Sequence, residues 1–277
     1  MNMGETLNAD DSVDAALVGV CGVAEKLKPC GVFTAELVRE GKVVWREEFP
    51  NLVVTVGKNA MEDQSLSGSA YSVTGPFMGL IALTGYSPTI TTITSGTYNN
   101  GTGAVNITTA GNHNLAVGDS FTLNTLTGTG GFAGLNGTWV ATAGTTGTTL
   151  NFTGTIGLGA STITGGNVTY GIKLSDTMTA HGGWLEAGLA NPPTYTAPRG
   201  TVAFSAAAGG VKATSVAVNF TFTGTGTVKG AFLVFGAGAV STIDSTTGIL
   251  FSAGLFLTGD RAVFGGDQLN VSWQLSM

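Results

Sequence analysis

The stretch that decides the fold is Val32–Phe49, VFTAELVREGKVVWREEF, in which two strand-like runs flank a short turn. The runs are Val32–Arg39 and Lys42–Phe49. Glu40 and Gly41 between them make a two-residue turn, in which glycine supplies a positive φ. This pattern predicts a β-hairpin, and most of its solvent face is charged: Glu36, Arg39, Lys42, Arg46 and Glu48.

The rest of the chain outward from this hairpin is rich in short strands and glycine turns. A short helix is predicted to open at Gly57–Gln64, directly after the hairpin. Many short strands with regular turn signals favour an all-β fold, namely a β-sandwich or a jelly-roll-like domain. The predicted strands are Phe77–Leu83, Thr201–Ser205, Ser215–Phe222, Val228–Phe235, Gly248–Leu257 and Gln268–Leu275.

Residues 88–170 have a different composition and predict an inserted module. Thr and Gly fill 40 of these 83 positions, and Asp119 is the sole charged residue among them. We therefore interpret 88–170 as a small β module in a loop of the main β domain, which would span 31–87 plus 171–277. A continuous β-solenoid is the less favoured alternative, because no fixed repeat is present. The strands predicted inside the module are Ala104–Thr109, Ser120–Leu126, Gly137–Thr142 and Thr149–Thr153.

Composition narrows the possible functions. Eleven Lys and Arg against 17 Asp and Glu do not provide a basic surface for nucleic acid. Two cysteines and two histidines leave almost no ligands for a metal centre, so no cofactor or metal is expected. No stretch reaches the roughly 18 apolar residues of a membrane span. A secretory signal is not expected either, and Cys21 and Cys30 are interpreted as reduced thiols rather than a disulfide.

Residues 1–30 predict a separate arm. Residues 12–28 favour a short helix with Ser12 as its N-cap, and Pro29 ends it. A helix of this length is marginal alone in water, so its apolar stripe is expected to dock on another copy or on the β domain. The stripe recurs mostly every three or four residues and consists of Val13, Ala16, Leu17, Val20, Val23, Ala24 and Leu27.

Two groups of residues have the chemistry of a catalytic site. His113 and Asp119 suggest a catalytic pair, but a polar turn leading into the strand at Ser120 is favoured, because no nucleophile accompanies them. His181 and Glu186 flank Trp184. There the favoured interpretation is a buried anchor at Trp184, with the polar pair facing a loop or a partner.

Two further candidate sites are also interpreted as structural. Gly224–Gly230 superficially suggests a phosphate loop, but the Walker spacing is missing and a hairpin tip is favoured. A hydrolase of glycans would need two facing carboxylates, whereas the acids after residue 75 are scattered. Asp260 and Arg261 are expected to form a surface ion pair. Because each candidate site has a favoured structural interpretation, the sequence predicts a protein that is not an enzyme.

Several segments of the main domain resemble virion structural proteins of tailed bacteriophages, of the kind that decorates or cements the capsid. The resemblance lies in the charged hairpin and in five motifs: FPNLVVTVGKN at 49–59, SAYSVTGPFMGL at 69–80, AHGGWLEA at 180–187, GTGTVKG at 224–230 and GDQLNVS at 266–272.

The insert is similar to a small β module that many phage structural and tail proteins share. It carries His113-Asn114-Leu115, Val117-Gly118-Asp119 and Leu135–Val140. The family usually has His-Gly-Leu at the first motif, so Asn114 departs from the pattern and the turn there is expected to differ in detail. The resemblance specifies a head or a tail location only weakly.

The resemblance implies a structural protein on the exterior of the virion capsid. Its partners would be the major capsid protein and further copies of itself, with no nucleic acid and no membrane. The alternative is a tail or fibre component whose insert binds a host glycan or receptor through Tyr98, Phe132 and Trp139. For Phe132 and Trp139, however, the favoured interpretation is that they fill the core of the module. The residues expected to contact partners are Val13, Leu17, Val20, Leu27, Trp139 and Trp184.

Overall fold

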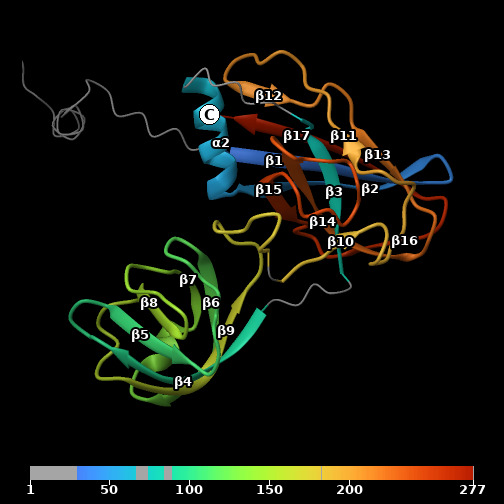
Figure 1. The fold of residues 1–277 in the computed structure, drawn as a ribbon. Helices are drawn as coiled ribbons and strands as arrows, with labels where there is room; N and C mark the ends of the chain where they lie inside the picture. Colours follow the sequence, from blue (N-terminus) through green and yellow to red (C-terminus); the bar gives the residue numbers. More distant parts are fainter. Residues whose placement is uncertain (1–29, 67–73, 84–88, 182, 277) are drawn as a thin grey trace, which may run out of the picture.

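The protein is all-β and forms a sandwich-like main domain and a second, smaller β-structure (Figure 1). The computed structural model describes residues 30–66, 74–83, 89–181 and 183–276. Two antiparallel sheets of eleven and six strands make up this part of the chain, with one α-helix, α2 (Thr55–Leu66), and one short 3-10 helix, η1 (Phe132–Leu135).

The eleven-stranded sheet folds over on itself to make the sandwich. Its main path is β10-β3-β14-β15-β2-β1-β17-β12, while β11 pairs with β3, β13 with β17 and β16 with β14. The strands are β1 (Cys30–Arg39), β2 (Lys42–Val53), β3 (Phe77–Ala82), β10 (Glu186–Ala187), β11 (Gly200–Thr201), β12 (Val211–Ala213), β13 (Val218–Thr221), β14 (Gly226–Phe235), β15 (Ile249–Leu255), β16 (Arg261–Val263) and β17 (Gln268–Ser276).

The predicted hairpin is confirmed as β1 and β2. Glu40 and Gly41 at its turn have φ values of 50° and 74°, and positive φ at both central residues matches the right-handed twist of the two strands. β2 continues beyond Phe49, so that Val53 pairs with Ser252 of β15. One strand therefore connects the two halves of the sandwich.

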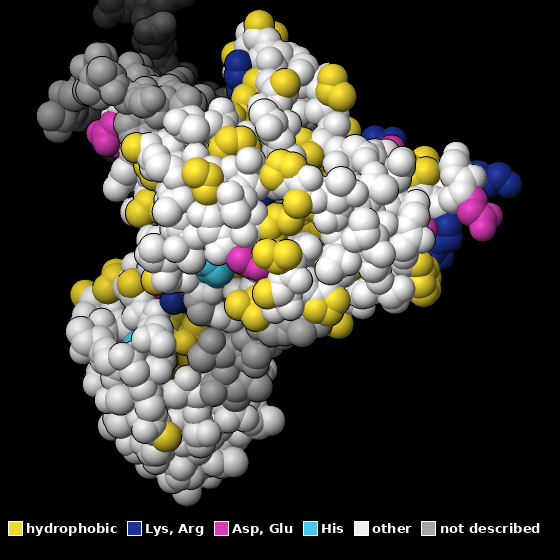
Figure 2. Space-filling model, turned by 45° about the vertical axis from the view of Figure 1, so that its right-hand side comes forward, with side chains coloured by type: hydrophobic (Ala, Val, Ile, Leu, Met, Phe, Trp, Pro, Cys, Tyr) yellow, Lys and Arg dark blue, Asp and Glu magenta, His cyan; other side chains and the backbone are white. Residues whose placement is uncertain are grey.

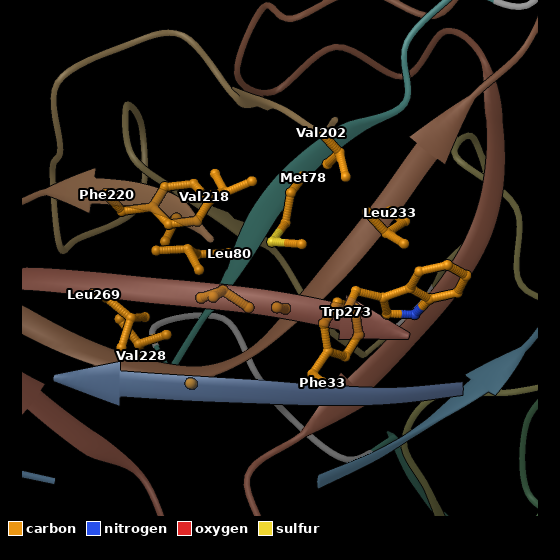
Figure 3. Packing of buried hydrophobic residues seen from close by; sticks show 14 of the residues in the cluster. Phe33, Met78, Leu80, Val202, Val218, Phe220, Val228, Leu233, Leu269 and Trp273 are labelled. Atoms are coloured by element: carbon orange, nitrogen blue, oxygen red, sulfur yellow. The ribbon is translucent and has the colours of Figure 1, made fainter. Parts of the chain in front are cut away.

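The core of the sandwich lies between these halves. Along β17 the side chains alternate between buried and more exposed positions, which is the period of a strand with one face on a core. Figure 3 shows Phe33 of β1 and Trp273 of β17 in the same apolar cluster as Met78 of β3 and Leu233 of β14.

The helix predicted at Gly57–Gln64, after the hairpin, is confirmed as α2. A glycine brings α2 close to the sheet. A Cβ atom at Gly57 would lie 2.5 Å from the carbonyl oxygen of Phe251. Helix and strand β15 can therefore approach each other only because this residue has no side chain.

Most strands of the main domain coincide with predicted runs, with two corrections. Of the run predicted at 201–205, only Thr201 belongs to a strand, namely β11 (Gly200–Thr201). Gly224–Gly230 is not a hairpin tip, because β13 pairs with β17 whereas β14 pairs with β3, β15 and β16. The chain therefore crosses there from one half of the sandwich to the other. The short strands β10, β12 and β16 had no predicted counterpart, since two or three residues show no periodicity.

The six-stranded sheet is built entirely from residues inside the range 88–170. Its order is β7-β6-β9-β4-β5-β8. The Thr142 N–H beyond the end of β7 donates to the Asn151 carbonyl of β8 at 2.8 Å, so the sheet curls round and closes into a small barrel. The strands are β4 (Thr89–Tyr98), β5 (Ala104–Thr109), β6 (Ser120–Thr129), β7 (Gly137–Val140), β8 (Thr149–Thr153) and β9 (Thr162–Tyr170).

The barrel has its own core and a single point of attachment. Its buried apolar side chains, such as Phe121 and Phe152, form a cluster separate from that of the sandwich. The first and last residues of the barrel, Thr89 and Tyr170, are partners across β4 and β9. β4 and β9 are the two central strands, and no run was predicted for either, because Thr and Gly fill most positions where a strand usually shows apolar side chains.

Candidate functional site

His113 lies in the polar turn that the sequence favoured, and its ring is fully buried. Its Nδ1 accepts a hydrogen bond from the Leu115 N–H at 3.0 Å, so the proton is on Nε2, which donates to the Thr149 carbonyl at 3.0 Å. Both ring nitrogens therefore hold the backbone of the barrel. His113 fixes the loop that precedes β6.

Asp119 does not pair with His113 but binds the chain that leaves the barrel. Its Oδ2 accepts from the Ala116 N–H at 2.8 Å and from the Ser175 hydroxyl at 2.6 Å, and its Oδ1 accepts from the Ser175 N–H at 3.0 Å. The carboxylate is fully buried. A lone acid in a stretch without any other charge is the sequence signal that points to this buried structural role.

Residues 173–176 connect the barrel to the sandwich, and we call them the junction segment. Lys173 Nζ donates to the Asn114 carbonyl of the barrel at 2.8 Å. The Leu174 carbonyl accepts from the Thr55 N–H, at the start of α2, at 2.9 Å. One short segment thus holds both bodies through hydrogen bonds.

Asp176 closes the junction segment on itself. Its Oδ2 accepts from the Lys173 N–H at 2.9 Å, and its Oδ1 lies 3.7 Å from Lys173 Nζ. Burial raises the pKa of Asp176 to about 6, because the loss of water outweighs the stabilising contacts from Lys173 and from the Trp184 indole. The charge state of this carboxyl therefore changes just below neutral pH.

Trp184 is a buried anchor, and its predicted contact with a partner is wrong. Its side chain is only 1% exposed, its ring centroid is 5.1 Å from that of Phe232, and His181 stacks on it at 3.9 Å. Burial lowers the pKa of His181, so this ring is neutral. The indole fills the interior beside β14 and leaves no surface for another protein.

Glu186 was expected to face a loop or a partner, and the structure shows that it faces loops, where it is buried. It forms a two-pronged ion pair with Arg199, through Nε–Oε1 and Nη2–Oε2 contacts of 2.8 and 2.6 Å. Arg199 is fully buried and Glu186 is 6% exposed. The Asp244 N–H also donates to Glu186, at 2.8 Å. This pair holds the loops around β10 together, and sequence analysis could not identify Arg199 as its partner.

Trp139 and Phe132 are half-buried and pack against the barrel core, while the partner contact of Trp139 stays a prediction. The Trp139 indole N–H donates to the Leu135 carbonyl at 2.7 Å, and its ring centroid lies 5.3 Å from that of Phe152. In a small module with few large side chains, these rings supply the core. Val13, Leu17, Val20 and Leu27, the remaining predicted contact residues, lie outside the described residues, as do the predicted helix and Cys21.

An uncharged groove of about 680 Å³ lies on the barrel between β4, β5 and β8. Its side chains offer hydrogen bonds and one aromatic face. Asn99 Oδ1 accepts from two backbone N–H groups, and Asn100 Oδ1 accepts from the Gly159 N–H at 2.7 Å, so both amides are held in place. Tyr98, Asn106 and Asn151 complete the polar lining.

The charged side chains of the sandwich gather around the β1–β2 turn, at one end of the molecule (Figure 2). Seven of them lie within residues 36–48. The Arg39 guanidinium lies 4.7 Å from the ring centroid of Phe264, and that of Arg261 lies 4.4 Å from the ring of Trp45. The sequence predicted an ion pair between Asp260 and Arg261, and this is wrong. Asp260 pairs instead with Lys229, at 2.6 Å.

Exposed apolar side chains lie among these charges. Val43 and Val44 are 57% and 53% exposed, and Leu257 is 67% exposed. The Leu257 N–H donates to Glu47, which places it beside β2. We call this surface the hairpin patch, and it consists of Arg39, Lys42, Val43, Val44, Arg46, Leu257, Arg261 and Phe264.

Comparisons of the chain with protein-family models, with curated proteins and with solved structures return no match. Among the described residues, no three side chains of His, Cys, Asp or Glu form a group that could hold a metal ion. In the same part of the chain, no helix has both the length and the apolar character needed to cross a membrane.

Proposed function

We propose that this protein is a structural component of a tailed-phage virion, which decorates the capsid and binds the major capsid protein through the hairpin patch. The observation that carries the proposal is the composition of that patch. Arginine, an aromatic ring and aliphatic side chains exposed together are typical of the central residues of protein interfaces. The phage resemblance of the hairpin and of the segments around it supports the same conclusion.

The position of the hairpin patch also suits a decorating protein. From Val43 to Leu52 the chain runs nine residues along β2, or about 30 Å at 3.3 Å per residue. Leu52 lines a groove between the sandwich and the barrel, together with Phe121 and Tyr170. The hairpin patch and the barrel therefore lie at opposite ends of β2, so a protein attached by the patch would hold its barrel away from the capsid.

The candidate catalytic residues support a role without catalysis. His113 uses both ring nitrogens on backbone groups, and Asp119 and Glu186 are each engaged by several donors. A carboxylate held in this way is a structural acceptor rather than an acid or base open to a substrate. We propose that the protein is not an enzyme.

Binding to purified phage heads tests the proposal. Val44→Asp introduces a charge into the hairpin patch and is expected to weaken binding by about tenfold or more, corresponding to about 1.4 kcal/mol. The matched control is Val216→Asp, because Val216 is 72% exposed but lies outside the patch. Equal binding by both variants would contradict the assignment of this surface, and absence of the protein from tail-free heads would contradict the head location.

A second candidate function rests on the groove of the barrel. Because the groove is lined by amides, threonines and Tyr98 and carries no charge, it suits a neutral glycan better than an acidic one. The protein would then be a tail or fibre component. Of the three aromatic residues considered for this role, Tyr98 alone lines the groove.

A glycan array with the full chain distinguishes the two functions. Specific binding that is lost in Asn106→Ala, whose amide donates to Asn151 at 2.7 Å, would favour the glycan function. Asn219→Ala is the matched control, because Asn219 makes the same 2.7 Å contact with Asn270 on the sandwich. An array without specific binding would remove the second candidate.

A further inference from the structure

We propose that the N-terminal arm, residues 1–29, seats its apolar stripe in a cavity at one end of the sandwich of its own chain. The cavity measures about 300 Å³ and is formed mainly by aromatic and aliphatic side chains. These come from α2 and from both halves of the sandwich: Met61, Phe204, Phe235, Phe251, Trp273 and Leu275.

The aromatic rings form a continuous wall around this cavity. Trp273 lies 5.5 Å from Phe251 and 5.7 Å from Phe204, measured between ring centroids, and Phe235 lies 5.3 Å from Phe251. Figure 3 shows Trp273 and Leu233, a further lining residue, at the same end of the core. An apolar cavity of about 150 Å³ accepts a benzene ring, so this one has room for about two aliphatic side chains.

The position of the arm's attachment identifies it as the occupant. Cys30, the first described residue, is the register partner of Ser276, and Gly31 is the partner of Leu275, which lines the cavity. The arm, residues 1–29, is therefore joined to the sandwich at a point beside the cavity. Leu27 is three residues from Cys30, and attachment to the same chain gives the arm a high effective concentration at this site.

Charge complementarity supports the same occupant. Lys212 is the one charged residue in the lining of this cavity, and its ammonium lies 5.7 Å from the ring centroid of Phe204. Residues 1–29 carry five acids against two bases, Lys26 and Lys28, so the arm as a whole is acidic. Lys212 also pairs with Leu275 across β12 and β17, so it lies on the side of the cavity where the arm begins.

Zero-length carbodiimide cross-linking of the full chain tests this seating, because it joins a lysine amine to a carboxylate in direct contact. We expect a product between Lys212 and an acid of the arm, and Glu25, which is five residues before Cys30, is the nearest along the chain to this side of the cavity; the others are Glu5, Asp10, Asp11 and Asp14. In a mixture of isotopically light and heavy protein, the product should join residues of one copy. The product should be lost in Leu17→Asp, which disrupts the stripe, and retained in Val18→Asp, the matched control off the stripe.

Two outcomes would overturn the proposal. A cross-link found only between light and heavy copies would assign the cavity to the arm of a second copy. No cross-link, together with hydrogen exchange at residues 12–28 that is identical in the parent chain and in Leu17→Asp, would show that the stripe is not seated at all.

Discussion

The barrel and the sandwich differ most in where they keep their charges. The barrel has one acid, Asp119, and one histidine, His113, and both are fully buried. The sandwich carries its charges mainly around the β1–β2 turn, and it buries the ion pair Glu186–Arg199. The barrel surface therefore offers hydrogen-bonding groups without charge, whereas the proposed contact through the hairpin patch would include electrostatic contacts that salt weakens.

The difference extends to how each body is stabilised. The barrel closes its sheet, so it leaves few unpaired strand edges, and its small core is enough to hold short threonine-rich strands. The sandwich instead depends on its larger core and on buried polar contacts between loops. Four substitutions test this contrast, beginning with the largest expected effect.

Arg199→Met should destabilise the sandwich most. It leaves Glu186 buried without its counter-ion, and breaking a buried pair in this way costs about 3–5 kcal/mol of unfolding free energy. Chemical denaturation followed by tryptophan fluorescence measures the change. The double variant Glu186→Leu/Arg199→Met should recover much of the loss, and Arg46→Met, in a surface pair with Glu36, should cost less than about 1 kcal/mol.

Asp176→Asn should alter how stability depends on pH. The folded pKa of about 6 lies above the ordinary value of 3.8, so between these pH values the folded chain binds more protons than the unfolded chain. Stability from this group is therefore present at low pH and is lost as pH rises through 6, by about 3 kcal/mol at most. Denaturation at pH 4.5 and pH 7 should show a smaller difference in Asp176→Asn than in the parent chain. An unchanged difference would contradict the role of this carboxyl.

Asp119→Asn should loosen the connection between the two bodies. The amide keeps only one acceptor oxygen, so it cannot accept both from the Ser175 N–H, which now donates to Oδ1, and from the two groups that donate to Oδ2. Hydrogen bonds to a charged carboxylate of this kind contribute about 1.5–3 kcal/mol each. We expect faster proteolysis within residues 171–185 and a lower unfolding free energy. Asp260→Asn is the control, because its pair with Lys229 lies at the surface and should contribute less than about 1 kcal/mol.

Trp139→Phe should have the smallest effect. The ring remains in the barrel core, but the hydrogen bond to the Leu135 carbonyl is lost, at about 1 kcal/mol. Binding to phage heads should be unchanged, since this indole packs inside the barrel. A binding defect without a loss of stability would support the partner contact that sequence analysis assigned to Trp139.

The elements that sequence analysis predicted well have patterns confined to a few neighbouring residues. The β1–β2 hairpin is defined by its turn, and β5 and β8 have the predicted bounds, Ala104–Thr109 and Thr149–Thr153. β4 and β9 were missed because threonine and glycine together fill most of their positions, and neither residue distinguishes a strand from a loop by hydropathy.

The errors at the candidate site have a different physical cause. Glu186 is satisfied by Arg199, which is 13 residues away and reaches it across a loop, so no local pattern shows the pairing. Trp184 was assigned to a partner contact although the sequence also favoured a buried anchor there. In a chain with few large side chains, however, such rings are needed first to fill the interior.

The pairing of Thr89 with Tyr170 has a consequence for how such a chain can change over evolutionary time. Register partners in an antiparallel pair lie about 5 Å apart, so the barrel leaves and rejoins the sandwich at one point. Any domain whose two ends are equally close could replace it by recombination without moving β3 or β10. The same geometry makes this position suitable for displaying a foreign domain, with the sandwich retained as its support.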